Sequence, residues 1–272
     1  MALRTALFVE GSFGLPNRAL TLPHRALWRE TIAPALGLLP PDDVIPISKA
    51  QLAQLRRNDP TLAGGKQPSI SGSAEALDQL MQRWLNRHPF DVAIIAWDLV
   101  PRLNHLTETC RWHETLELYR LLGASKLPDP WPQRARLRFA ELAQRPHPGA
   151  RTRLPSITPG TVLAVCMEPM FEGIFADERA LRAALRMKGV TSRLWPSKWD
   201  PRRPDNELVG PAIAAAQAAK VQLPIRCGFQ PAKDEWGAYL FRTILADPEH
   251  GPRLAEHALL RRLREVMRDP GA

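Results

Sequence analysis

The sequence predicts an α/β fold in which a mostly parallel sheet is flanked by helices and followed by a helical C-terminal part. Short, continuously apolar segments, typical of buried parallel strands, alternate with segments of helical periodicity. Such alternation favours a parallel sheet that helices cover on both faces. The predicted strands are residues 3–9, 43–47, 91–97 and 161–167.

Helical periodicity marks the segments between and after the strands. Ser73 can cap a helix that runs to about Arg87, because apolar residues recur on one face of that segment. The other predicted helices are residues 24–37, 105–122, 132–144, 177–188, 206–219, 230–246 and 252–268.

These elements predict a chain of four parts. Residues 1–125 form the first part of an α/β core, and residues 126–160 are a Pro- and Arg-rich insertion or connection. Residues 161–190 complete the core, and residues 191–272 form a basic, mainly helical C-terminal part. The 27 prolines are spread along the chain, which indicates short elements with rigid connections rather than disorder.

The chain is strongly basic, with 37 Lys and Arg against 28 Asp and Glu and a net charge of +9. This balance favours a polyanionic partner, and we expect nucleic acid, either DNA or RNA. Arginine greatly outnumbers lysine. Arginine binds phosphate through paired hydrogen bonds, but a GC-rich genome would also favour its codons, so this preference decides little.

Cysteine usage and hydropathy predict a cytoplasmic protein. Cys110, Cys166 and Cys227 are odd in number and far apart, which argues against a disulfide scaffold and for a reducing compartment. The apolar segment near the N-terminus is too short for a signal peptide. No segment approaches the ~20 apolar residues of a membrane span, so we expect no membrane association.

Acidic residues follow three of the predicted strands. Glu10, Asp98 and Glu168 each come directly after an apolar segment. Ligands of parallel sheets bind beyond the carboxyl ends of the strands, where such acids can converge. Carboxylates suit Mg²⁺ or Mn²⁺, although an acid at a strand end, close to water, is also ordinary. We expect Glu10 and Asp98 to share a divalent metal.

The strand that ends at Glu10 resembles the first motif of TOPRIM domains, in which a hydrophobic strand leads into Glu-Gly, as residues 7–11 do here. TOPRIM domains occur in topoisomerases, primases and overcoming-lysogenisation-defect nucleases, and their second motif is Asp-x-Asp after a later strand. Here Val100 replaces the second Asp after Asp98. The resemblance implies a TOPRIM-like (Rossmann-like) sheet whose acidic site departs from the full pattern.

The sequence is more similar still to an uncharacterised TOPRIM-like family encoded beside ATPases in bacterial anti-phage defence operons. Residues 168–177 resemble its acidic segment, and residues 196–198 resemble its Pro-Ser-Lys loop. Cys227, Phe229 and Trp236 match a Cys, an aromatic residue and a Trp near its end. These motifs occur in the same order in both.

This resemblance implies roles for particular residues. Glu10, Asp98 and either Glu168 or Glu172 would form the acidic, catalytic site, and Lys198 would contact phosphate. It also implies an ATPase partner, since no nucleotide-binding motif is visible in this sequence.

Other chemical sites are poorly supported. His105, Cys110 and His113 lack a fourth ligand at zinc-site spacing. Gly64-Gly65-Lys66 lacks the spacing of a P-loop, and no Gly-x-Ser-x-Gly elbow is present.

Cationic residues gather beside Trp195 and along the last predicted helix. Aromatic and cationic residues together suit base stacking and phosphate contact, although Trp195 would equally well pin a loop by being buried. The candidate nucleic-acid-binding residues are Lys198, Arg193, Arg202, Arg203, Arg261, Arg264 and Arg268.

Three functions fit these observations. The first is a Mg²⁺-dependent phosphodiesterase or nuclease of an anti-phage defence system that acts with an ATPase partner. The second is a catalytically degenerate TOPRIM-like subunit that binds nucleic acid or regulates the ATPase, which Val100 favours. The third is a basic binding module without TOPRIM ancestry.

The last predicted helix generates a test. One face is apolar, and the opposite stripe carries Arg253, His257, Arg261, Arg264 and Arg268. Reversing Arg261, Arg264 and Arg268 to Glu is expected to weaken nucleic-acid binding and flatten its salt dependence, because fewer counterions are released. Unchanged binding in a titration over salt concentration would make the stripe a solubility feature.

Overall fold

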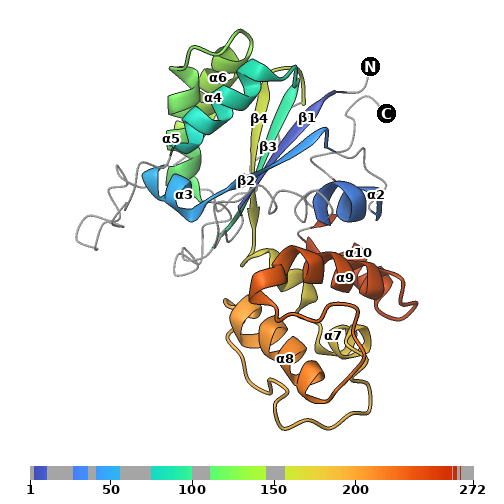
Figure 1. Cartoon of the computed structure of the whole chain (residues 1–272). Helices are drawn as coiled ribbons and strands as arrows, with labels where there is room; N and C mark the ends of the chain where they lie inside the picture. The colour runs from blue at the N-terminus through green and yellow to red at the C-terminus, as the bar shows by residue number, and fades with distance from the viewer. Residues whose placement is uncertain are drawn as a thin grey trace, which may run out of the picture. The chain divides into compact units, whose positions relative to one another are not determined.

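Four parallel strands form one sheet in the order β2-β1-β3-β4 (Figure 1). The strands are β1 (Thr5–Glu10), β2 (Asp43–Ile47), β3 (Val92–Asp98) and β4 (Thr161–Met167). The α/β prediction and its four strands are therefore confirmed. The computed structural model describes residues 3–10, 27–35, 41–55, 75–99, 111–144, 157–258, 260–261 and 264.

The contacts divide the chain into two compact units. The sheet unit comprises residues 1–13, 41–166 and 269–271. The helical unit comprises residues 14–40, 167–268 and 272. This division differs from the one expected from the sequence, because residues 126–160 fall within the sheet unit and the segment after β4 falls outside it.

The strand order creates a switch point between β1 and β3. Strand β1 pairs with β2 on one side, and the chain then returns to pair β3 with the other side of β1. In the register, Phe8 lies opposite Ile45 and Ile95. In open parallel sheets, ligands bind beyond the carboxyl ends of the strands at such a reversal, which here are the ends of β1 and β3.

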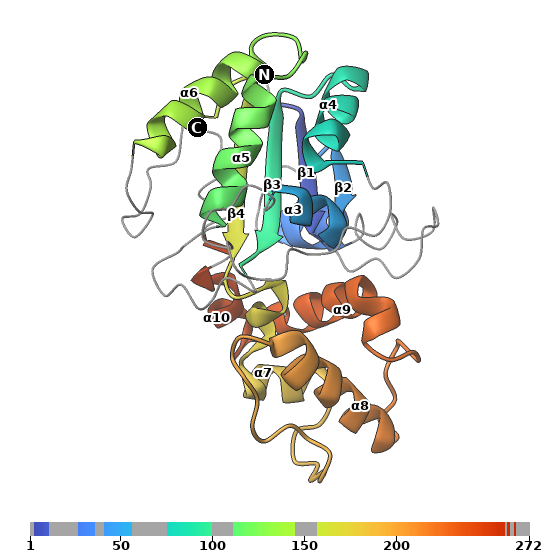
Figure 2. The same ribbon diagram turned by 90° about the vertical axis from the view of Figure 1, so that its left-hand side faces the viewer.

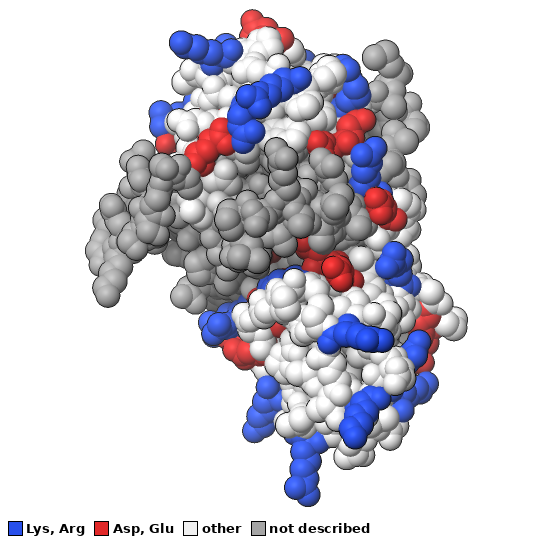
Figure 3. Space-filling model, in the orientation of Figure 1, with Lys and Arg blue, Asp and Glu red and all other residues white. Residues whose placement is uncertain are grey.

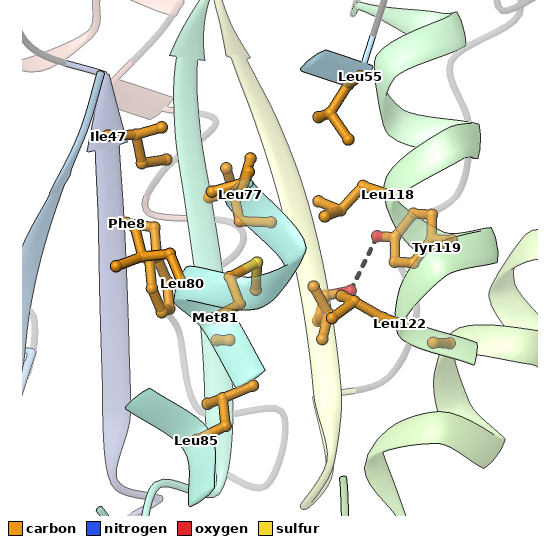
Figure 4. Close-up of a cluster of buried hydrophobic side chains, with 14 of the residues drawn as sticks. Phe8, Ile47, Leu55, Leu77, Leu80, Met81, Leu85, Leu118, Tyr119 and Leu122 are labelled. Carbon is orange, nitrogen blue, oxygen red and sulfur yellow. Dashed lines mark hydrogen bonds between the residues drawn. The ribbon is translucent and has the colours of Figure 1, made fainter. Parts of the chain in front are cut away.

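Four helices cover one face of the sheet, and Figure 2 shows them in front of it. They are α3 (Lys49–Leu55), α4 (Leu77–Arg87), α5 (Trp112–Gly123) and α6 (Trp131–Ala143). Phe8, Ile47, Leu118 and Leu122 meet in the core between these layers, all at most 2% exposed (Figure 4). The Tyr119 hydroxyl donates to the backbone carbonyl of Val162 at 2.8 Å and so ties α5 to β4.

Helix α6 confirms the helix predicted at residues 132–144, but its packing differs from the expectation of an insertion or connection. Trp131, Ala135 and Leu142 are at most 5% exposed, so α6 is part of the core. Helix α3 was not predicted, because its single short apolar face directly follows a strand. Helix α4 begins at Leu77, with Ala76 as its N-cap.

The helical unit is built from short helices. Trp236 and Phe241 of α9 are fully buried in it. The Tyr239 hydroxyl donates to the carbonyl of Ala184 at 2.8 Å and links α9 to α7. Its helices are η2 (Trp28–Ile32), α2 (Ala33–Ala35), η5 (Phe171–Phe175), α7 (Glu178–Ala184), η6 (Asp205–Val209), α8 (Gly210–Ala218), η7 (Gln230–Ala232), α9 (Lys233–Leu245) and α10 (Gly251–Ala255).

The predicted helix 252–268 is interrupted. Helix α10 ends at Ala255, Glu256 and His257 are not helical, and residues 258, 260, 261 and 264 are helical again. Among the described residues, no helix is long and apolar enough to cross a membrane.

Candidate functional site

The predicted acids Glu10 and Asp98 end the two strands that meet at the switch point. Glu10 is the last residue of β1, and Asp98 is the last residue of β3. The backbone N–H of Asp98 donates to Oε2 of Glu10 at 2.9 Å. The sequence therefore placed these acids at the correct edge of the sheet.

A buried arginine forms an ion pair with the Glu10 carboxylate. Nη2 of Arg111 lies 2.9 Å from Oε2 of Glu10, and the two side chains are 1% and 7% exposed. Arg111 directly precedes α5, and its carbonyl accepts hydrogen bonds from both the backbone N–H and the hydroxyl of Thr115. Sequence reasoning missed Arg111, because one arginine in an arginine-rich chain carries no distinguishing signal.

The alternation of side chains along the strands separates Glu10 from Asp98. Phe8 and Ile95 are paired and both face the helices. Glu10 follows Phe8 by two residues and so takes the same face, whereas Asp98 follows Ile95 by three and takes the opposite face. Direct coordination of one ion by both carboxylates would require the end of a strand to rearrange.

The described residues fit a divalent metal poorly. Within the described ranges, no group of three or more His, Cys, Asp or Glu side chains is placed to hold a metal ion. Oε2 of Glu10 already accepts hydrogen bonds from Asp98 and Arg111. A cation there would have to displace a buried guanidinium of its own sign, or lie beside it.

The other two predicted acids belong to the helical unit. Glu168 directly follows β4 and is exposed. Glu172 lies in η5 with its side chain only 12% exposed. Glu10 and Asp98 belong to the sheet unit.

Glu172 takes part in a second buried ionic cluster. Nζ of Lys233 lies 3.3 Å from Oε1 of Glu172 and 3.0 Å from Oδ2 of Asp205. Oδ2 of Asp205 also accepts a hydrogen bond from Asn206 at 3.0 Å. One ammonium thus serves two carboxylates, and sequence reasoning identified neither Lys233 nor Asp205.

Burial and mutual charge shift the pKa values in this cluster. Burial raises the pKa of Glu172, Lys233 partly opposes that shift, and the nearby Asp205 adds to it. Burial disfavours the charged form of Lys233, but the two carboxylates outweigh it and raise the pKa of that amine. The cluster therefore strengthens the charged form of the lysine and makes Glu172 easier to protonate than an exposed glutamate.

The Pro-Ser-Lys loop is held in place by Trp195. This side chain is 6% exposed, and its Nε1 donates to Oε1 of Glu178 at 2.9 Å. Trp195 therefore supports the loop instead of offering a free stacking surface. Arg193 and Lys198 in the same loop are exposed, with no acidic partner among the described residues.

The remaining predicted cations differ in their availability. Arg202 donates to both carboxylate oxygens of Asp200, from Nη2 to Oδ2 at 2.7 Å and from Nε to Oδ1 at 3.0 Å. Arg203 lies 3.9 Å from Glu207. Nη2 of Arg264 donates to the carbonyl of Ala255 at 2.6 Å and contacts Glu256 at 3.1 Å, so Arg264 folds back onto its own chain. Arg261 is exposed, and Arg268 and Val100 lie outside the described residues.

On the face that Figure 3 draws, the Lys and Arg side chains of the helical unit are separated by other atoms and form no single patch. Net charge alone therefore does not define a binding surface. The cations that lack an acidic partner nearby are the stronger candidates for contact with nucleic acid.

Comparison with known proteins found no family model, no curated protein and no solved structure that matches the chain.

The Lys233 cluster generates a pH prediction. A raised folded-state pKa of Glu172 means that the folded protein binds an extra proton, so stability is lost as pH rises above the unfolded value of 4.5. Glu172→Gln removes this loss, so its stability relative to the wild type should increase in urea unfolding as the pH rises above 4.5. Lys233→Met leaves two carboxylates uncompensated and should lose about 3 kcal/mol, with a larger loss at pH 8. If the unfolding free energy of both variants changed with pH as that of the wild type does, the raised pKa of Glu172 would be contradicted.

Proposed function

We propose that this chain is a nucleic-acid-binding protein whose TOPRIM-like acidic site serves structure rather than catalysis. The observation that carries the proposal is the buried ion pair of Glu10 with Arg111. It corresponds to a degenerate subunit, which would work beside an ATPase if the resemblance to the defence-associated family holds.

The ion pair supports a structural role for Glu10 because the chain supplies its own cation. Arg111 is 1% exposed and cannot move into water without disturbing the start of α5. Breaking a buried pair by removing one partner costs about 3–5 kcal/mol, since the other charge is left uncompensated. The absence of the second Asp of the TOPRIM pattern, where Val100 stands, agrees with this role.

The exposed cations support binding to nucleic acid. Arg193 and Lys198 project from a loop that Trp195 fixes, so less backbone entropy is lost when they contact phosphates. Net charge of +9 attracts polyanions over a distance of about one Debye length. Contacts of this kind bind the phosphate backbone and confer little sequence specificity.

Loop variants test the binding proposal. Arg193→Gln with Lys198→Gln should weaken duplex DNA binding about tenfold and reduce the slope of log K against log salt by about two, because two phosphate contacts are lost. The matched control, Arg202→Gln with Arg203→Gln, removes the same charge from arginines that acids already engage and should have a smaller effect. A wild-type chain that binds neither DNA nor RNA at low salt would refute the proposal.

A second candidate is the Mg²⁺-dependent phosphodiesterase. It is favoured by one observation, the position of Glu10 and Asp98 at the ends of neighbouring strands at the switch point. A nuclease would also need an arrangement in which Arg111 no longer holds the Glu10 carboxylate.

Glu10→Gln separates the two candidates by its effect on the stability of the metal-free protein. If Glu10 is structural, the variant should lose about 3 kcal/mol of unfolding free energy with or without Mg²⁺ or Mn²⁺, because Arg111 remains buried without its carboxylate. If Glu10 is a metal ligand, the metal-free variant should be as stable as the wild type, and Glu10→Gln and Asp98→Asn should both abolish stabilisation by metal. Metal-dependent cleavage of DNA or RNA by the wild type, lost in both variants, would establish the second candidate.

A further inference from the structure

The helical unit contains a hollow of about 450 Å³ lined largely by arginines. Arg179 and Arg182 come from α7, and Arg253 comes from α10. Asp177 and Glu178 complete the lining. Arg179 and Arg182 have no part in the function proposed above.

The two acids of the hollow are already engaged. The Asp177 carboxylate accepts hydrogen bonds from the backbone N–H groups of Arg179 and Ala180, at 2.9 and 3.2 Å. Oε1 of Glu178 accepts from Nε of Arg182 and from Nε1 of Trp195, both at 2.9 Å. The two acids therefore leave N–H groups of the arginines in the hollow available to a ligand.

The arginines combine one fixed group with two adaptable ones. The guanidinium of Arg182 lies 4.0 Å from the centre of the Trp195 ring and uses Nε for Glu178, so its Nη groups keep their donors in a defined position. Arg179 is exposed, and its side chain has no acidic partner among the described residues. Arg253 is 65% exposed and lies only loosely beside Asp177, at 3.7 Å.

We propose that this hollow binds a phosphomonoester, a phosphate group with two negative charges and a single substituent. Several guanidinium groups around one concavity match the donor demand of such an anion, because each can offer paired N–H groups to phosphate oxygens. A diester has one charge and a substituent on each side, so it suits a flat surface better than a hollow. The ligand is either a free nucleotide or the phosphorylated end of a nucleic-acid strand.

Isothermal titration of the full chain with methyl phosphate tests the site, with dimethyl phosphate as the diester comparison. The wild type should bind methyl phosphate saturably and dimethyl phosphate at least about tenfold more weakly. Arg179→Gln with Arg253→Gln should reduce methyl phosphate affinity about tenfold or more, because two charge-assisted contacts are lost. Both side chains are exposed, so the variant is expected to fold.

The matched control is Lys188→Gln with Arg226→Gln, which removes the same charge from exposed positions of the helical unit outside the hollow. It should change the affinity less than about twofold, as expected for distant screened charges. Equal losses in both double variants, equal binding of the two esters, or no saturable binding by the wild type would each overturn the proposal.

Two further measurements identify the ligand. Methyl phosphate should bind about fourfold more weakly at pH 5.5 than at pH 7.5, because a second pKa of about 6 leaves a minority of dianion at the lower pH. A pH-independent affinity would overturn the requirement for two charges.

A preference for 5′-phosphorylated over 5′-hydroxyl oligonucleotides, lost in Arg179→Gln with Arg253→Gln, would support a strand end. Binding of methyl phosphate without that preference would support a free nucleotide, whether or not the chain binds nucleic acid.

Discussion

The buried ion pair between Glu10 and Arg111 constrains the functional edge of the sheet. It joins three elements, because Glu10 ends β1, accepts the backbone N–H of Asp98 at the end of β3, and binds the arginine that precedes α5. Charges buried to this extent are tolerated only when they are paired and hydrogen-bonded. The pair therefore fixes where α5 begins relative to the switch point, and it decides what chemistry the acids there can perform.

The helical unit also pairs its buried acids with a cation. Lys233 lies between Glu172 and Asp205, and all three side chains are at most 19% exposed. In each unit an acid that we predicted to be catalytic forms an ion pair with a cation from a distant part of the chain. An acid neutralised internally attracts a metal ion less strongly, which supports the proposal that surface cations make the contacts with phosphates.

The sequence predicted the framework better than the site. Strand β4 lies at the predicted residues. A parallel strand that is buried on both faces is continuously apolar, and such a segment can be recognised from the local sequence alone. Contacts between distant segments were not predictable, because Arg111 and Lys233 look like any other cation until the fold places them beside acids. Helix α6 was predicted as a helix, but its burial was not, because its Pro- and Arg-rich sequence does not reveal that Trp131 lies in the core.

Nearby acids and packing contacts determine which surface cations are available to contact a ligand. Arg202 and Arg264 counted as binding residues by position, yet each is held by its own neighbourhood. Arg193 belongs to a loop whose Trp195 packs beneath Arg182 and donates to Glu178 on α7. The loop and the arginine hollow thus share one aromatic support, so the rigidity that positions the loop cations also orients a guanidinium in the hollow. In a chain with this excess of arginine, such preorganisation is the physical difference between a binding group and a solvated one.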